Sequence, residues 1–218
     1  MTESPGTRSS WTPARWPADE VAAKALRDWL AGPPGEDFYG IELDFSGADL
    51  SGGDFTEAWF SKSRLLGATL RNCSLVRAHV EEADFSDADL SGADLTKVSG
   101  RGSVFRDARL RGTDLKAAEL NRADFTGADL TGANLGDALL TRSTLARANL
   151  TDATADKAVL RNTILDSAQV RGLTGTVIGP ISVIFRGQRA LLDGPDLEQW
   201  FNTRGARITR FHADKDAS

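Results

Sequence analysis

Few side chains in this sequence could carry out catalysis. The 218 residues include one cysteine, Cys73, and two histidines, His79 and His212. Their spacing matches no zinc-ligand pattern, and no glycine-rich loop that could bind phosphate joins a strand to a helix. We therefore expect no catalytic residues, no cofactor, no metal and no enzymatic activity.

Aspartates are the chemically active residues that recur with regular spacing. They stand directly before a large apolar residue and suggest an acidic surface for a partner. Aspartate also favours turns by accepting backbone hydrogen bonds, so a purely structural role stays open. The nine positions are Asp44, Asp49, Asp54, Asp84, Asp89, Asp94, Asp114, Asp124 and Asp129.

A five-residue repeat determines where these aspartates lie. From Phe45 to Val170, 24 of the 26 residues at every fifth position are Phe, Leu or Val, with Gly100 and Ala155 as exceptions. Small residues, mostly Ala, stand two positions earlier. A period of five fits neither an α-helix nor a flat two-faced strand. It fits a chain that turns a corner after every five residues and directs its large and small residues to one interior.

The repeats resemble the pentapeptide-repeat family. The resemblance rests on runs such as Ala-Asp-Phe-Ser-Asp at 83–87 and Ala-Asp-Leu-Thr-Gly at 128–132. It implies an all-β solenoid, a right-handed quadrilateral β-helix with four pentapeptides in each coil. The repeats would form about six and a half coils, and the rod would be on the order of 30 Å long.

With four repeats per coil, every fourth repeat falls in the same column. One interior column is rich in Phe, so aromatic stacking is expected there. Gly100 leaves a gap in another column and suggests a bulge or a local softening. On the outside, the fourth column lacks aspartate, and its apolar residues form a candidate contact face: Trp59, Leu139 and Val159.

The sequence predicts five segments. Residues 1–16 form a flexible tail, 17–40 a helical cap and lead-in, and 41–173 the β-helix. Residues 174–211 form a strand–helix–strand unit for capping or dimerisation, and 212–218 a disordered tail. The cap or dimer candidates in the C-terminal unit are Ile184, Phe185, Leu197, Trp200 and Phe201.

Charge restricts the partners. The net charge of −5 argues against direct nucleic-acid binding, no apolar run is long enough to cross a membrane, and no signal peptide is evident, so we expect a cytoplasmic protein. The resemblance implies a DNA mimic that binds DNA gyrase or topoisomerase IV, gives resistance or self-protection against topoisomerase poisons, and dimerises through its C-terminal unit.

The charge of the repeats limits this interpretation. Residues 41–173 hold 20 Asp+Glu and 16 Lys+Arg, whereas a duplex of that length carries roughly eighteen phosphates. Mimicry would therefore need segregated charge. The alternative is a protein-interaction scaffold or an immunity-type protein with an unknown partner.

Overall fold

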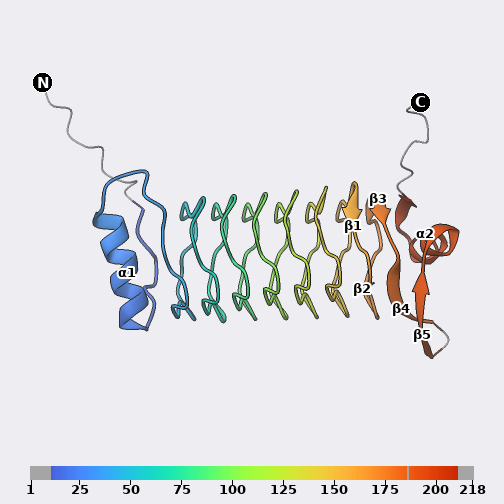
Figure 1. Ribbon diagram of the computed structural model, residues 1–218, viewed down its shortest axis with the longest axis horizontal. Coiled ribbons are helices and arrows are strands. Elements are labelled where there is room, and N and C mark those ends of the chain that lie inside the picture. The colour runs from blue at the N-terminus through green and yellow to red at the C-terminus, as the bar shows by residue number, and fades with distance from the viewer. Residues whose placement is uncertain (1–10, 186, 211–218) are drawn as a thin grey trace, which may run out of the picture.

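The computed structural model describes residues 11–185 and 187–210, which form an elongated rod (Figure 1). Helix α1 (Glu20–Ala31) lies across one end of the rod. A stack of similar coils follows, and a small unit of strands and one helix forms the other end. The repeat thus occupies the middle of the molecule, and the non-repetitive segments lie at its two ends.

Parallel β-bridges set the register of the coils. Each bridge in the stack joins residues twenty positions apart, as in Asp44 with Arg64 and Arg64 with Asp84. The Phe45 N–H donates to the carbonyl oxygen of Arg64 at 2.7 Å, and the Arg64 N–H donates to that of Leu43 at 2.9 Å. Twenty residues are four pentapeptides, so the predicted β-helix with four pentapeptides in each coil is confirmed.

A tight turn follows each large interior residue. The Ala48 N–H donates to the carbonyl oxygen of Phe45 at 3.1 Å, and Gly47 between them has a φ of 68°. Other corners place a side chain in this left-handed region, as Lys62 does at 59°. None of the non-glycine residues with positive φ in the described chain is β-branched, since a branched Cβ is disfavoured there.

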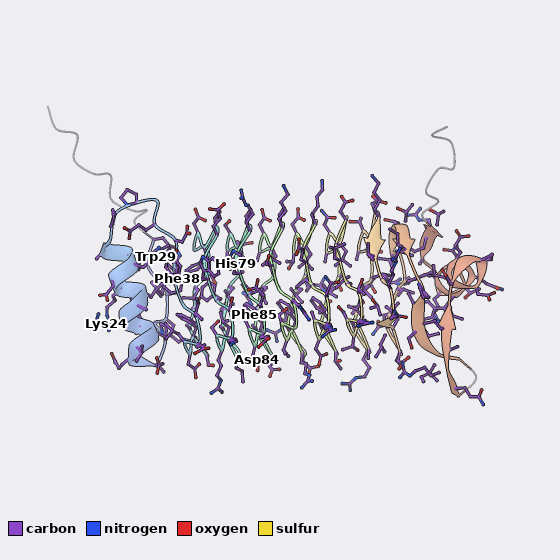
Figure 2. All side chains as sticks on the ribbon, in the orientation of Figure 1. Lys24, Trp29, Phe38, His79, Asp84 and Phe85 are labelled. Carbon is purple, nitrogen blue, oxygen red and sulfur yellow. The ribbon has the colours of Figure 1, made fainter. Side chains whose placement is uncertain are left out.

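The interior follows the predicted columns. Phe85 is fully buried while the neighbouring Asp84 points outward (Figure 2). Phe105 stacks on Phe85 with ring centroids 5.0 Å apart, and Phe125 stacks on Phe105 at 4.8 Å. The prediction of aromatic stacking in this column is confirmed.

Gly100 causes no bulge, one of the two alternatives predicted for it, and the other, a local softening, stays a prediction. Its N–H donates to the carbonyl oxygen of Glu119 at 2.9 Å, so the backbone ladder continues unbroken. A Cβ on Gly100 would lie 2.8 Å from the Leu120 side chain and 3.0 Å from that of Val80. Its two neighbours in the column therefore fill the gap.

Helix α1 packs on the first coil. Asp19 caps its N-terminus, since the carboxylate accepts a hydrogen bond from the Ala22 N–H at 2.8 Å. Ala22, Ala23 and Leu26 are buried. Trp29 stacks on Phe55 at 5.6 Å, so the helix brings an aromatic ring onto the end of the apolar interior.

Residues 11–16 were expected in a flexible tail, but they lie against the first coil. Arg15 and Asp49 form an antiparallel bridge in which each donates its N–H to the other's carbonyl oxygen, at 3.4 and 2.9 Å. The Trp11 indole N–H donates to the carbonyl oxygen of Ser51 at 2.8 Å. Residues 11–16 lie here because they form hydrogen bonds with a strand edge of the first coil that would otherwise be open. The rest of both predicted tails, residues 1–10 and 212–218, lies outside the described residues.

At the C-terminal end of the repeats, the last coils continue into two small three-stranded sheets. Short strands β1 (Ala158–Val159) and β2 (Thr163–Ile164) pair in parallel with β3 (Thr174–Ile178) and β4 (Ile181–Phe185). β5 (Gln188–Leu192) turns back antiparallel to β4. Helix α2 (Gly194–Asn202) follows, and β6 (Arg207–Arg210) pairs in parallel with β3.

The C-terminal unit is therefore more elaborate than a strand–helix–strand motif. The predicted helix and final strand are present, but three strands precede the helix instead of one. β3 and β4 continue the parallel ladder of the coils. The antiparallel return of β5 ends that ladder on one face of the rod.

Candidate protein-binding surface

The β-helix assembles the nine predicted aspartates into three adjacent columns. The bridges run from Asp44 through Arg64 to Asp84 on the first face, and from Asp49 through Thr69 to Asp89 on the second. On the third face, Asp94 and Asp114 are direct neighbours. The columns expected from the sequence are those that the fold forms.

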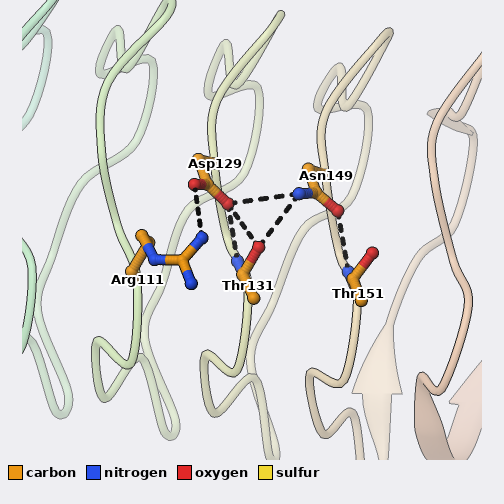
Figure 3. A network of polar contacts seen from close by, with 5 residues as sticks. All are labelled: Arg111, Asp129, Thr131, Asn149 and Thr151. Atoms are coloured by element: carbon orange, nitrogen blue, oxygen red, sulfur yellow. Dashed lines mark hydrogen bonds and ion pairs between the residues drawn. The ribbon is translucent and has the colours of Figure 1, made fainter.

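All nine aspartates have a structural role in the turn. In each, Oδ1 accepts a hydrogen bond from the backbone N–H two residues later, at 2.9 to 3.1 Å. Asn134 and Asn149 make the same bond at equivalent positions. Figure 3 shows this bond at Asp129 and at Asn149. The turn therefore needs the acceptor oxygen and does not need the charge.

Arginines neutralise most of the first two columns. Arg71 contacts Asp89 at 2.6 Å, Arg106 contacts Asp124 at 2.6 Å, and Arg111 contacts Asp129 at 3.0 Å. Each of these arginines stands eighteen residues before its aspartate, at the position after the large residue in the preceding coil. Figure 3 shows the third of these pairs. A weaker pair joins Arg64 and Asp44 at 3.6 Å.

The paired carboxylates stay charged to low pH. Burial alone would raise the pKa of Asp89, but hydrogen bonds from Ser91 and Arg71 outweigh it and lower that pKa. Burial is likewise outweighed at Asp129 by bonds from Thr131 and Arg111, so its pKa is also lowered. These charges are held within the surface and face a guanidinium.

The third column differs. Asp54, Asp94 and Asp114 form no ion pair within residues 11–185 and 187–210, so no predicted aspartate of this column is paired, whereas in the first two columns Asp49 and Asp84 are the two without an ion pair. The residues eighteen positions before Asp94 and Asp114 are Val76 and Thr96, which carry no positive charge. The sequence carries this signal in the residue type at one repeat position, and the prediction of nine equivalent aspartates overlooked it.

The predicted apolar contact face is not one continuous patch. Trp59, Leu139 and Val159 share a column and are each half-buried, but Ser99 and Glu119 separate Trp59 from the other two. Trp59 instead stacks on His79, with ring centroids 3.8 Å apart, and on Tyr39 at 6.2 Å. The column thus holds an aromatic stack near one end and aliphatic residues near the other.

Most of the predicted dimer residues are interior. Leu197, Trp200 and Phe201 are buried, because α2 packs these side chains beneath it. Ile184 is exposed, and so is Leu191 on the neighbouring strand. Phe185 lies in β4, and its side chain is outside the described part of the molecule. Of the predicted dimer surface, the β4–β5 face is therefore the part that can meet a second molecule.

Cys73 and His79 do not form a nucleophile pair. The buried Cys73 thiol contacts the carbonyl oxygen of Leu50 at 2.9 Å, and burial raises the pKa of this thiol to about 12. His79 lies on the outside against Trp59. His212 lies outside the described residues.

Within the described residues we find neither a cluster of metal-ligating side chains nor a membrane-spanning helix. Residues 11–185 and 187–210 contain no group of three or more His, Cys, Asp or Glu side chains that could hold a metal ion. Neither helix in this part of the chain has the length and apolarity needed to cross a membrane.

Comparison with known proteins identifies the repeats. The family model for the pentapeptide repeat region matches residues 78–155, and the model for eight copies of pentapeptide repeats matches residues 41–65 and 143–173. No curated protein sequence matches.

Several solved structures are similar. HetL, involved in heterocyst differentiation regulation in the cyanobacterium Nostoc sp., is 24% identical over 76% of this chain and 97% of its own, with a TM-score of 0.32. The plasmid-mediated fluoroquinolone resistance protein QnrB1 is 17% identical over 65% of this chain and 73% of its own, with a TM-score of 0.39. A protein of the Arabidopsis thaliana thylakoid lumen is 21% identical over 78% and 81%, with a TM-score of 0.24.

These TM-scores all lie below 0.5, so the similarities do not bear on function. The family is established by the matched repeats themselves, which cover the same stretch as the bridged coils. The chain belongs to the pentapeptide-repeat proteins.

Proposed function

We propose that this chain is a non-enzymatic binding protein that offers its third column of carboxylates to a basic protein surface. The partner we propose is a type II topoisomerase such as DNA gyrase, with resistance or self-protection against topoisomerase poisons as the outcome. The observation that carries the proposal is the lack of ion pairs at Asp54, Asp94 and Asp114 among the described residues.

The density of negative charge along the third column resembles that of DNA more closely than the net charge of the whole rod does. The three carboxylates span three coil steps, about 14 Å at the spacing of paired strands. One strand of B-form DNA carries about four phosphates over that length. Three charges against about four is a close match, whereas the net charge of the repeats falls far short of a duplex.

Asparagine substitutions separate charge from structure. Because Asn134 and Asn149 already close this turn, the D54N/D94N/D114N variant should fold normally without the column's charge. The matched control is D44N/D124N/D129N, which removes three carboxylates that already face arginines.

The test is a gyrase supercoiling and poison-protection assay. We expect wild type and the control variant to act at micromolar concentration. The third-column variant should be roughly tenfold or more weaker, because three interfacial charges are removed together. An inactive wild type would overturn topoisomerase as the partner. Equal loss in both variants would overturn the third column as the site.

The second candidate is a protein-interaction scaffold or immunity-type protein with another partner. The stack of Tyr39, Trp59 and His79 on the outside of the rod favours it, because aromatic side chains are enriched at protein interfaces. A photo-crosslinking residue at Tyr39 should capture this partner in cells. The same residue at Thr144, in the first column, is the control, and equal capture from both positions would contradict the scaffold interpretation.

We further propose a homodimer formed through the β4–β5 surface, where Ile184 and Leu191 are exposed. Light scattering of wild type and of I184D/L191D tests this proposal. A dimer mass that falls to a monomer mass in the variant is expected. A monomer mass for wild type would exclude the dimer. Trp200 and Phe201 are unsuitable targets because charge there would disrupt the core.

The segment boundaries and compartment are also proposals. We propose a rod of about six and a half coils over residues 41–173, with residues 17–40 and 174–211 as caps, in the cytoplasm. A chain that begins at residue 35 would expose the first coil and is expected to self-associate through that edge. Light scattering of this chain against the full chain measures the effect, and an unchanged mass would contradict the capping role.

A further inference from the structure

A row of exposed arginines lies at one corner of the rod. The corner consists of the two residues that follow the large interior residue of the fourth column, and four consecutive coils each place one arginine there. Backbone hydrogen bonds hold these coils side by side. The Arg122 N–H donates to the carbonyl oxygen of Thr141 at 3.0 Å, and the Arg142 N–H donates to that of Arg161 at 2.8 Å. We call this row the arginine stripe, and its members are Arg101, Arg122, Arg142 and Arg161.

The stripe has no ion pair to neutralise it. None of its members pairs with a carboxylate among residues 11–185 and 187–210. Earlier in the same corner, Lys62 contacts Glu42, twenty residues before it, at 3.6 Å. The residues twenty positions before and after Arg122 are Gly102 and Arg142. The row therefore offers Arg122 a second positive charge where an earlier coil supplies a carboxylate.

A carboxylate next to the stripe is also unpaired. Glu119 in the fourth column follows Arg101 by eighteen residues, the spacing at which Arg71 contacts Asp89. Among the residues that the structure describes, no ion pair joins Glu119 to Arg101. The positive charge of the stripe is thus available to another molecule.

The turn does not account for the arginines. The two positions of this corner hold other residues in other coils, such as Ser61 at the first position and Gly102 at the second. Like charges on neighbouring strands of a ladder are destabilising. A row of arginines therefore works against the stability of the coils, and an anionic partner would explain its presence.

The shape of the stripe favours a narrow partner. Its members span three coil steps, about 14 Å. The first column begins beside it, with Asp124 two residues after Arg122, and the chain as a whole has a net charge of −5. A DNA duplex or a lipid bilayer is wide and would bring its phosphates against these carboxylates as well. An extended peptide can lie along the corner alone.

The neighbouring side chains also favour a peptide. Leu139 and Val159, both half-buried, lie in the fourth column next to the C-terminal half of the stripe. Apolar side chains of a peptide can contact them, whereas phosphates cannot. Guanidinium groups bind carboxylates through paired hydrogen bonds. Phosphates on one strand of a duplex repeat about every 3.4 Å, which does not match a coil spacing of about 4.8 Å, whereas a flexible segment can adjust its spacing.

We propose that the arginine stripe binds an acidic, extended segment of a partner protein. Carboxylates of the segment pair with the four arginines, and apolar residues between them contact Leu139 and Val159. The stripe is separate from the third column, and the proposal does not depend on a topoisomerase as the partner.

Fluorescence anisotropy with the full-length chain tests this proposal. The probe is a labelled peptide of alternating Gly and Glu, about ten residues long, which is more than enough to span about 14 Å. We expect micromolar binding at low ionic strength and a loss of binding as salt is added, because salt screens exposed charges. The same peptide with Gln in place of Glu should bind roughly tenfold or more weakly.

Paired substitutions test the named residues. R122Q/R142Q removes the two central arginines and should weaken binding of the Glu peptide about fivefold to tenfold, as expected for two exposed ion pairs. The matched control, R147Q/R171Q, removes two exposed arginines from other corners and changes the net charge equally. Its binding should stay within about twofold of wild type. Both variants should unfold at the wild-type temperature, because all four side chains are exposed.

The proposal is overturned if wild type does not bind the Glu peptide, if the Glu and Gln peptides bind equally, or if both variants weaken binding equally. Duplex DNA and vesicles that contain phosphatidylserine are titrated in the same way. Tighter binding of either one, lost in R122Q/R142Q, would replace the acidic segment as the occupant of the stripe.

The D54N/D94N/D114N variant separates this proposal from the proposed function. It keeps the arginine stripe and should bind the Glu peptide at least as well as wild type, whatever its result in the gyrase assay. Failure of the stripe and failure of the proposed function are therefore distinguishable.

Discussion

The second and third faces of the rod carry the same aspartate at the same repeat position, yet they differ in available charge. On the second face, Arg71 and Arg111 in the preceding coils reach Asp89 and Asp129. On the third face, Val76 and Thr96 occupy the positions that would supply those arginines. The same turn bond forms at all of these aspartates, and the residue after the large residue of the preceding coil explains why an arginine pairs with Asp89 and Asp129 and, in the described chain, none with Asp94 and Asp114.

Alanine substitutions of the aspartates on these two faces should have the largest effect on stability and should differ between the faces. D89A removes the turn acceptor and an ion pair whose carboxylate is buried and whose arginine is exposed, and we expect a loss of about 2 to 3 kcal/mol in the free energy of unfolding. D94A removes the turn acceptor without a pair and should cost about 1 to 1.5 kcal/mol. Urea denaturation of both variants measures the difference, and equal losses would show that the arginine contributes nothing.

The carboxyls with lowered pKa values should make the stability of the fold depend on pH in the acid range. The hydrogen bond from the Ser51 side chain lowers the pKa of Asp49, and hydrogen bonds that outweigh burial lower those of Asp89, Asp124 and Asp129. A carboxyl whose folded pKa is depressed stabilises the fold above its unfolded pKa of about 3.9. That stability is lost as pH falls from there through the folded pKa.

Denaturation between neutral pH and pH of about 3 tests this linkage. The D89N/D124N/D129N variant should lose less stability on acidification than wild type. The matched variant R71Q/R106Q/R111Q keeps the serine and threonine hydrogen bonds. Its loss of stability on acidification should lie between those of wild type and the D89N/D124N/D129N variant. Parallel profiles for all three proteins would refute the assigned cause.

The smallest effect on stability should come from building the missing pair. V76R places an arginine eighteen residues before Asp94 and should add at most about 0.5 kcal/mol, as exposed ion pairs do. It should nevertheless weaken the proposed topoisomerase binding, because it neutralises a carboxylate of the third column. V76Q is the uncharged control. Unchanged activity of V76R would remove Asp94 from the proposed surface.

The repeat made most of the fold predictable. Phe85, Phe105 and Phe125 stack because twenty residues make one coil, and that period can be read directly from the chain. The non-repetitive ends were harder. Residues 11–16 looked like a tail, and Leu197, Trp200 and Phe201 looked available to a partner. Local composition does not tell whether an apolar side chain meets its own molecule or another.

The sequence alone determined the register, the interior columns and the position of every aspartate, because a strict five-residue period leaves one way to bury Phe, Leu and Ala together. Tertiary structure decided which charges remain available, since an ion pair depends on side chains from two different coils. It also decided where Trp11 lies, because its place on Gly53 and Phe55 exists only once the first coil has closed.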